Sequence, residues 1–177
     1  MLVTLSPLGT VVVDTLAWLV VHLGVAWAVT QLDARRFDPT ARLFRERAFE
    51  RGGLSYQRVF RIESWKRLLP DGARLFRRGF RKKRLGSRSP AYLARFRVET
   101  CRSELAHWLV AACAPLFFLW NSVGVGCVML AYAVLANLPC ILAQRYNRCR
   151  LSRVLARTGQ ATAAGGAAAD PAAAAEG

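Results

Sequence analysis

Residues 101–150, CRSELAHWLVAACAPLFFLWNSVGVGCVMLAYAVLANLPCILAQRYNRCR, decide the fold. Two apolar runs, residues 105–120 and 125–143, flank a short segment, NSVG, that predicts a turn. A helix needs about 20 apolar residues to cross the hydrocarbon core of a bilayer, and neither run contains Lys, Arg, Asp or Glu. We therefore expect a helical hairpin that crosses the membrane and returns to the side from which it came.

A further apolar run, TVVVDTLAWLVVHLGVAWAVT, occupies residues 10–30 and is also about one bilayer long. Asp14 lies near its start, where its carboxylate can reach the interface. His22 lies mid-run, where an ionisable side chain is either functional or a neutral imidazole hydrogen-bonded to another helix. No Lys or Arg precedes the run, so the basic region of a signal peptide is absent. We expect a retained helix.

The charge is concentrated between these runs. Of 26 Lys and Arg residues, 21 lie between Asp33 and Glu104 together with eight carboxylates, which gives that block a charge of +13 out of a net +15. Basic flanks stay in the cytoplasm, so we expect the N-terminus outside and the C-terminus inside. The fold class predicted is an all-α integral membrane protein with about three transmembrane helices. Nucleic-acid binding is a weaker interpretation, because it gives the apolar runs no role.

Four segments follow from this pattern. Residues 1–32 form the first membrane helix, 33–103 a basic, partly helical cytoplasmic or interfacial block, 104–158 the hairpin with its polar end, and 159–177 a disordered Ala/Gly-rich tail. Within the block, FDPTARLFRERAFERGG (37–53) predicts a short amphipathic helix, and LSYQRVFRIESWKRLLPDG (54–72) a helix in the headgroup layer. The cationic run 74–88 predicts a patch facing anionic lipid. A helix from residue 90 leads into the hairpin.

Metal binding and disulfide bonding are both disfavoured by the cysteines. There are five, an odd number, with no C-x-x-C and no Cys/His spacing typical of zinc. We expect no metal site and no disulfide framework.

The polar residues at the membrane end of the hairpin carry the candidate chemistry. Glu104 and His107 share one helix face, and a carboxylate beside an imidazole suits a general base. The alternative is a capping Glu and a hydrogen-bonded His. After the hairpin, guanidinium forks in the run QRYNRCR suit phosphate or carboxylate, although simple positive-inside anchoring would also place arginines there. Asn137 and Pro139 interrupt the last apolar run, where the Asn side chain needs a hydrogen-bond partner and the Pro leaves a backbone carbonyl without its helical donor. No nucleophile elbow, P-loop or H-E-x-x-H motif is present.

Three motifs in this region form a recognisable set: R-x-E-L-x-H-W at 102–108, A-N-x-P at 136–139 and Q-R-Y-N-R-x-R-L at 144–151. With these motifs, residues 102–151 closely resemble the glycosyl-4,4'-diaponeurosporenoate acyltransferases, small bacterial membrane proteins of the staphyloxanthin carotenoid pathway. A fainter resemblance covers Trp65, Lys66, Asp71 and Gly72, and the first apolar run around Trp18. His22 has no counterpart in the resemblance and is not predicted to be catalytic.

The resemblance implies a membrane acyltransferase that moves a fatty acyl group to a sugar hydroxyl of a glycosylated carotenoid or related glycolipid. The predicted catalytic residues are His107 as base, Glu104 as its orienting carboxylate and Asn147 as a donor to the carbonyl oxygen. The predicted substrate-binding residues are Arg145, Arg148, Arg150, Gln144, Tyr146, Asn137, Trp65, Lys66 and Asp71. The three arginines would hold the anionic part of an acyl donor, such as acyl-CoA as co-substrate, or stabilise charge on the carbonyl oxygen.

No cofactor is expected, and the expected partners are the acyl donor, the glycosylated acceptor and membrane lipids, but not nucleic acid. The expected location is the bacterial cell membrane, as a multi-pass protein. The alternative function is a non-enzymatic membrane protein whose basic loop binds anionic lipid or scaffolds partner enzymes.

Overall fold

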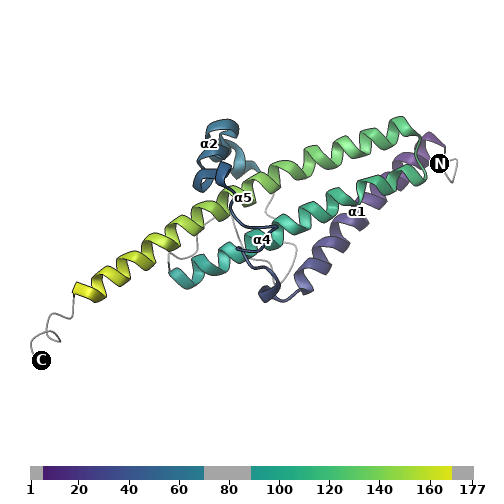
Figure 1. Ribbon diagram of the computed structural model, residues 1–177. Helices are drawn as coiled ribbons and strands as arrows, with labels where there is room; N and C mark the ends of the chain where they lie inside the picture. The colour runs from purple at the N-terminus through teal and green to yellow at the C-terminus, as the bar shows by residue number, and fades with distance from the viewer. Residues whose placement is uncertain (1–5, 70–88, 169–177) are drawn as a thin grey trace, which may run out of the picture.

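The computed structural model describes residues 6–69 and 89–168, and this part of the chain is helical without strands, which confirms the all-α prediction. Three long helices dominate: α1 (Pro7–Gln31), α4 (Pro90–Ala112) and α5 (Val123–Ala168) (Figure 1). The short elements are η1 (Ala34–Arg36), η2 (Ala48–Gly53), α2 (Leu54–Phe60), α3 (Ile62–Trp65), η3 (Lys66–Leu68) and η5 (Ala114–Leu119).

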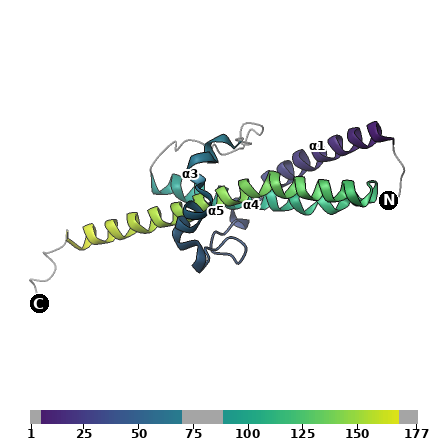
Figure 2. The same ribbon diagram turned by 90° about the horizontal axis from the view of Figure 1, so that it is seen from above.

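The predicted hairpin is present. α4 and the first half of α5 lie side by side and antiparallel, and α1 lies against α4 (Figures 1 and 2). α4 begins as its sequence indicates, because Ser89 caps it and Pro90 occupies its first turn. It ends at Ala112, just before Pro115, which has no N–H to donate. A 3₁₀ helix, η5, then continues to the turn at Asn121 and Ser122.

One tryptophan joins α1 to both limbs of the hairpin. Trp18 stacks on Phe117 of η5 with ring centroids 4.4 Å apart. Its Nε1 donates to Met129 Sδ of α5 at 3.3 Å, and its ring meets Tyr132 edge-on at 5.2 Å. These residues lie at the centre of the apolar half of the molecule, where Phe117 is 1% exposed. Aromatic packing therefore positions α1 on the hairpin.

Polar contacts hold α1 near both of its ends. Asp14, near the start of α1, is buried within the protein and accepts hydrogen bonds from Trp120 Nε1 and Asn121 Nδ2, each at 2.8 Å. Its place near the membrane interface stays a prediction. At the other end, Arg102 Nη1 donates at 2.7 Å to the backbone oxygens of Val29 and Leu32. Arg102 thereby satisfies carbonyl groups that the end of a helix leaves without intrahelical partners.

Two helical segments are long and apolar enough to cross a membrane: α1 and the Val123–Gln160 part of α5. Large apolar side chains of α1 such as Leu8, Val20 and Trp27 are exposed on the protein itself, which suits contact with lipid. The run 105–120 does not form a third such helix, since it is divided between the end of α4 and η5. Three crossings and the N-outside orientation remain predictions.

The amphipathic helix predicted over 37–53 is wrong. Residues 39–45 form turns and bends, and η2 begins only at Ala48. The carbonyl groups of Leu43 and Arg45 accept hydrogen bonds from a side chain of α5, and that of Phe44 from another. Tertiary hydrogen bonds thus replace the helical ones. The helix predicted over 54–72 is present in pieces, because α2 stops at Arg61, whose φ is 48°.

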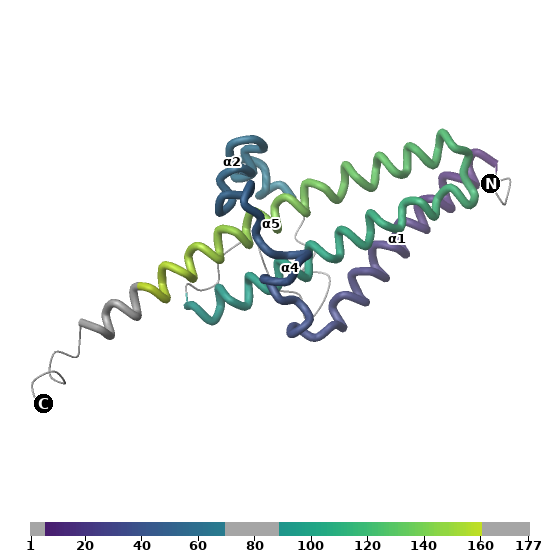
Figure 3. Tube along the Cα trace, in the orientation of Figure 1, coloured from purple at the N-terminus to yellow at the C-terminus, as the bar shows by residue number. Residues whose placement is uncertain are grey.

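α5 continues far beyond the hairpin, as the Cα trace in Figure 3 shows. Its 46 residues span about 69 Å at 1.5 Å per residue. The helix runs through Ala168 and so extends into the segment 159–177, for which we expected disorder; the rest of that segment lies outside the described residues.

Gly53 tests how closely the block packs on α5. Its φ is +91°, and a Cβ there would lie 3.3 Å from Tyr146 Cδ2. Gly53→Ala should destabilise the protein by about 1–2 kcal/mol, because an L-residue is strained in the left-handed region. Thermal unfolding in detergent measures this. Gly124→Ala is the control, since Gly124 has open space around it and should tolerate alanine; equal losses in the two variants would contradict the prediction.

Candidate active site

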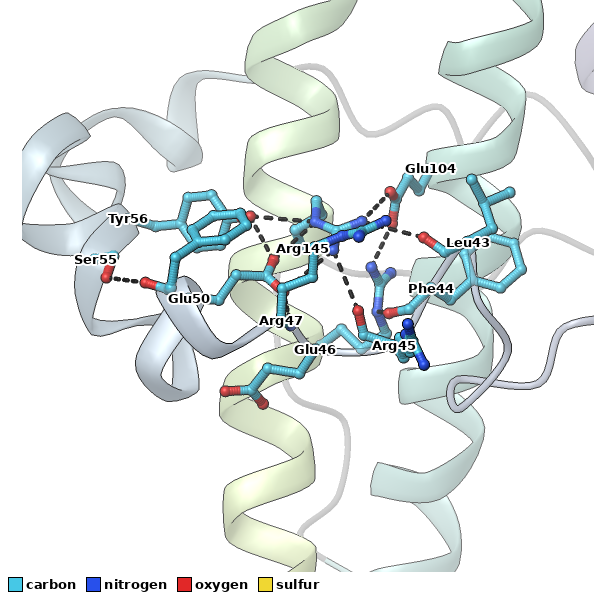
Figure 4. Close-up of polar contacts among 12 residues, drawn as sticks. Leu43, Phe44, Arg45, Glu46, Arg47, Glu50, Ser55, Tyr56, Glu104 and Arg145 are labelled. Atoms are coloured by element: carbon cyan, nitrogen blue, oxygen red, sulfur yellow. Dashed lines mark hydrogen bonds and ion pairs between the residues drawn. The ribbon is translucent and has the colours of Figure 1, made fainter.

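A buried carboxylate of α4, Glu104, faces two arginines of α5 at the polar end of the hairpin; Figure 4 shows it with Arg145. Glu104 is 0% exposed. Its Oε1 accepts from Arg145 Nη1 at 2.8 Å, and its Oε2 forms an ion pair with Arg148 Nη2 at 2.5 Å. The spacing of Arg145 and Arg148 places both on one face of α5. The first and third sequence motifs therefore meet in the fold.

A second buried carboxylate comes from the basic block, residues 33–103. Arg145 Nε donates to Glu50 Oε1 at 2.8 Å, and Arg145 Nη2 donates to Glu50 Oε2 at 3.2 Å. The Tyr56 hydroxyl donates to Glu50 Oε1 at 2.5 Å (Figure 4). Arg145 thus joins η2, α4 and α5. We call Glu50, Tyr56, Glu104, Arg145 and Arg148 the buried charge network.

Sequence analysis missed Glu50 and Tyr56. Glu50 lies in a stretch that also contains Glu46 and Glu63, and nothing in the local pattern separates it from them. Its partner Arg145 is 95 residues away. The one local sign is the pair Gly52-Gly53, which allows the left-handed turn at the end of η2.

The charges of the buried charge network balance, since two carboxylates face two guanidinium groups. Burial by itself would raise the pKa of Glu50, but hydrogen bonds from Arg145, Tyr56 and the Arg47 backbone outweigh it and hold that pKa below its usual value. Burial, together with the hydrogen bond to Glu50, raises the pKa of Tyr56. At neutral pH Glu50 is therefore ionised, and Tyr56 remains a protonated donor.

His107 lies one helical turn farther into the hairpin than Glu104. Its Nδ1 is 2.9 Å from Asn137 Oδ1, and Asn137 Nδ2 donates to the Ala133 carbonyl at 2.9 Å. Because Asn137 uses its NH₂ group on Ala133, its oxygen is the acceptor toward His107. The neutral imidazole then carries its proton on Nδ1 and its lone pair on Nε2. This tautomer is the one that a base acting through Nε2 requires.

We expected Glu104 to orient His107, but the hydrogen bond on Nδ1 goes to Asn137. The Glu104 carboxylate pairs with Arg145 and Arg148, and it also accepts from Trp108 Nε1 at 3.3 Å. The residue that positions the ring through Nδ1 is thus the buried Asn137, which is 2% exposed.

Four further predicted site residues gather where α3 and η3 meet α5. Tyr146 donates to Glu63 Oε1 at 2.6 Å, and Arg150 forms an ion pair with the same oxygen. Lys66 Nζ donates to Asn147 Oδ1 at 3.2 Å and lies 4.8 Å from the centre of the Tyr146 ring. The fold therefore brings the loop residue Lys66 onto the third sequence motif.

Of the three other predicted residues, the structure describes Trp65 and Gln144, and Trp65 packs against the apolar cluster that contains Tyr146. Trp65 is half-buried, and its Nε1 donates to the Phe60 carbonyl at 2.7 Å. Gln144 Oε1 is buried and accepts no hydrogen bond from the described residues. Asp71 lies outside the described residues.

A metal site was not expected. Within residues 6–69 and 89–168, no cluster of His, Cys, Asp and Glu side chains could hold a metal ion.

The fold and the site define a membrane-associated helical protein with a histidine and a set of charged residues at the polar end of an apolar hairpin. The family model described as glycosyl-4,4'-diaponeurosporenoate acyltransferase matches residues 40–157. Proteins with that name from Staphylococcus aureus are 31% (strain N315), 32% (strain MRSA252) and 30% (strain USA300) identical, over 81% of this chain and 88% of theirs. No solved structure matches the chain.

The chain therefore belongs to the glycosyl-4,4'-diaponeurosporenoate acyltransferase family, as its motifs predicted. It is an enzyme, an acyltransferase, which decides against the non-enzymatic alternative.

The buried charge network can be tested by removing one charge from it. Glu50→Gln leaves Arg145 without one of its two carboxylates and should lower the free energy of unfolding by about 3–5 kcal/mol. Glu63→Gln is the matched control, because the Glu63–Arg150 pair is about half exposed on both sides and should contribute less than about 1 kcal/mol. Thermal unfolding in detergent compares the two variants, and similar losses would show that Glu50 is not buried in an ion pair.

The lowered pKa of Glu50 predicts a loss of stability in acid. A carboxyl group whose pKa is lower in the folded state stabilises the fold above its ordinary pKa of 4.5, and this contribution disappears as the pH falls through the lowered value. The melting temperature should therefore fall below about pH 4.5 more steeply for the wild type than for Glu50→Gln. If the melting temperatures of the two proteins fall in parallel with pH, the ionisation of Glu50 does not stabilise the fold.

Proposed function

We propose that this acyltransferase moves a fatty acyl group onto a hydroxyl of a sugar attached to a carotenoid or a related glycolipid. The names of its relatives support this acceptor class, since they are glycosyl-4,4'-diaponeurosporenoate acyltransferases. The acceptor and the acyl chain are both largely apolar, which suits a site at the end of an apolar hairpin. The reaction would occur at the cytoplasmic surface of the bacterial cell membrane.

The observation that carries the mechanism is the hydrogen bond between His107 Nδ1 and Asn137 Oδ1. With the lone pair on Nε2, His107 accepts the proton of the sugar hydroxyl while the hydroxyl oxygen attacks the acyl carbonyl carbon. The bond between the carbonyl and its leaving group then breaks, and Nε2 returns the proton to the leaving group. For an acyl-CoA donor, the leaving group is a thiol. General base catalysis of this kind contributes about 10²–10⁴-fold.

The two buried arginines have a positioning role in this proposal. Arg145 and Arg148 are committed to Glu50 and Glu104, and moving them onto a substrate would leave buried carboxylates unpaired at a large cost. They hold α4, so that His107 keeps its place beside α5. Asn137 fixes the ring in the tautomer that the reaction needs.

The cations proposed to meet the anionic part of the acyl donor are Arg150 and Lys66. The Arg150 side chain is 52% exposed, and Lys66 lies beside Asn147 at the surface where η3 meets α5. Burial is the largest cause of the lowered pKa of Lys66, so this amine gains from an anion placed next to it. Asn147 lies within the same cluster, where its side-chain oxygen accepts a hydrogen bond from Lys66 and holds that amine in place.

The proposed topology has three crossings, with the N-terminus outside. The third crossing consists of the end of α4 together with η5, which accompany α5 to the turn at Asn121. Glu104 and Arg145 then lie at the cytoplasmic surface. The contacts between Asp14, Trp120 and Asn121 lie at the opposite surface, where a buried carboxylate is already supplied with donors.

The two histidines of the chain provide a matched test of the base. His107→Ala should reduce acyl transfer by at least about 10²-fold, because the hydroxyl then keeps its proton. His22→Ala should retain activity, since His22 bonds only to its own helix in the described contacts, through Nδ1 and the Trp18 carbonyl at 2.8 Å. Thermal unfolding in detergent checks that both variants fold; His107→Ala should melt at a somewhat lower temperature, because the buried Asn137 Oδ1 loses its donor. Wild-type turnover in a folded His107→Ala protein would exclude His107 as the base.

The acceptor can be identified by lipid mass spectrometry of the bacterium that encodes the protein. Deletion should remove a glycosylated lipid or carotenoid carrying one fatty acyl group, leaving the form without that group. Expression of wild type or His22→Ala should restore it, whereas His107→Ala should not. If deletion leaves every acylated glycolipid in place, the proposed acceptor class is wrong.

A further inference from the structure

The short helices of the basic block expose large apolar side chains. Val59 is 68% exposed, Phe60 46% and Leu68 82%, and Phe49 and Leu54 are also exposed. The same segment has a buried side, since Tyr56 is 5% and Ile62 0% exposed against α5. The exposed apolar residues therefore belong to a segment that is itself packed on α5. They occupy the outer side of a unit that is already anchored.

The charged residues around these side chains are arginines. Arg51, Arg58, Arg61 and Arg67 are all exposed. The carboxylates of the segment do not offset them, because Glu50 is buried against Arg145 and Glu63 pairs with Arg150. The outward side of residues 49–68 thus combines apolar side chains with unbalanced positive charge. We call it the apolar–arginine surface.

The fold places this surface beside the point where α5 changes character. α2 and its neighbours lie against α5 (Figures 1 and 2), with Gly53 next to Tyr146 and Cys149. The residues of α5 before Gln144 are apolar, and arginines follow. If α5 crosses the membrane, this change marks the edge of the hydrocarbon core, and the apolar–arginine surface lies at that level.

We propose that residues 49–68 dock on the anionic surface of the membrane that α5 crosses. Val59, Phe60 and Leu68 enter the boundary between headgroups and acyl chains, where apolar residues of interfacial helices insert. The four exposed arginines meet lipid phosphates, as juxtamembrane cations do. The surface then holds η3, with Lys66, at the depth where an amphiphilic substrate arrives. This inference extends the proposed membrane location and does not depend on the catalytic step.

Spin-label accessibility in vesicles tests the docking. Nitroxides are placed at Val59→Cys or Leu68→Cys of the full-length chain, with Cys113 and Cys127 replaced by Ser. The other three cysteines are buried. The vesicles are phosphatidylcholine with or without phosphatidylglycerol. Leu135→Cys, in the apolar half of α5, is the lipid reference, and Ala156→Cys, in its charged half, is the water reference.

With phosphatidylglycerol, labels at 59 and 68 should be reached by oxygen more than by a water-soluble nickel complex, as at 135. In vesicles without phosphatidylglycerol, the accessibilities of these two labels should shift toward those of the label at 156. Labels at 59 and 68 that match 156 in both vesicles would overturn the docking and leave the surface to a protein partner. Equal insertion in both vesicles would overturn the role of the arginines. A water-exposed label at 135 would overturn both the crossing by α5 and the docking.

A charge variant separates the two parts of the surface. Arg58→Gln with Arg61→Gln should remove the difference between the two vesicle types at position 68, because fewer cations meet the anionic lipid. If the two vesicle types still differ at position 68, groups other than Arg58 and Arg61 interact with the anionic lipid. The labels report depth and not turnover, so a failure here leaves the proposed acyl transfer intact. A failure of acyl transfer likewise leaves the depth result standing.

Discussion

The arrangement of this protein depends on one guanidinium group. Arg145 donates to Glu104 on α4 and to Glu50 in η2, and it is itself part of α5. A planar fork of donors can satisfy two carboxylates at once, which a lysine ammonium does less well. Burying these charges is costly, and the cost is offset because every charge in the network faces an opposite one. The network consequently fixes the positions of η2, α4 and α5 relative to one another, although these segments lie far apart in the sequence.

The conformation of the basic block follows from that network. Leu43, Phe44 and Arg45 turn their carbonyl groups toward Arg145 and Arg148, so these residues cannot form the helix that their spacing predicts. The chain then reverses through left-handed residues, with Gly52 and Gly53 supplying the conformations that other residues adopt only with strain. This backbone geometry brings Lys66 to the end of the hairpin beside Asn147.

Inside the hairpin, buried polar groups form separate layers. Glu104 and its arginines form one, His107 with Asn137 the next, and Asp14 with Trp120 and Asn121 the one near the turn. Aromatic packing around Trp18 lies between the second and the third. Each layer supplies hydrogen-bond partners for groups that would otherwise be buried without them. A histidine in such a setting keeps one tautomer, which is a condition for acting as a base.

The sequence by itself determined the helical class, the apolar hairpin, the basic block, the family and most of the polar residues that meet at the site. These features depend on composition, periodicity and short motifs, which are local properties of the chain. Only the tertiary structure decided the partners. Glu104 pairs with arginines, Asn137 contacts His107, and Glu50 joins the network from a segment predicted to be a short amphipathic helix. Such pairings arise between residues far apart in sequence, where no spacing rule indicates which carboxylate meets which arginine.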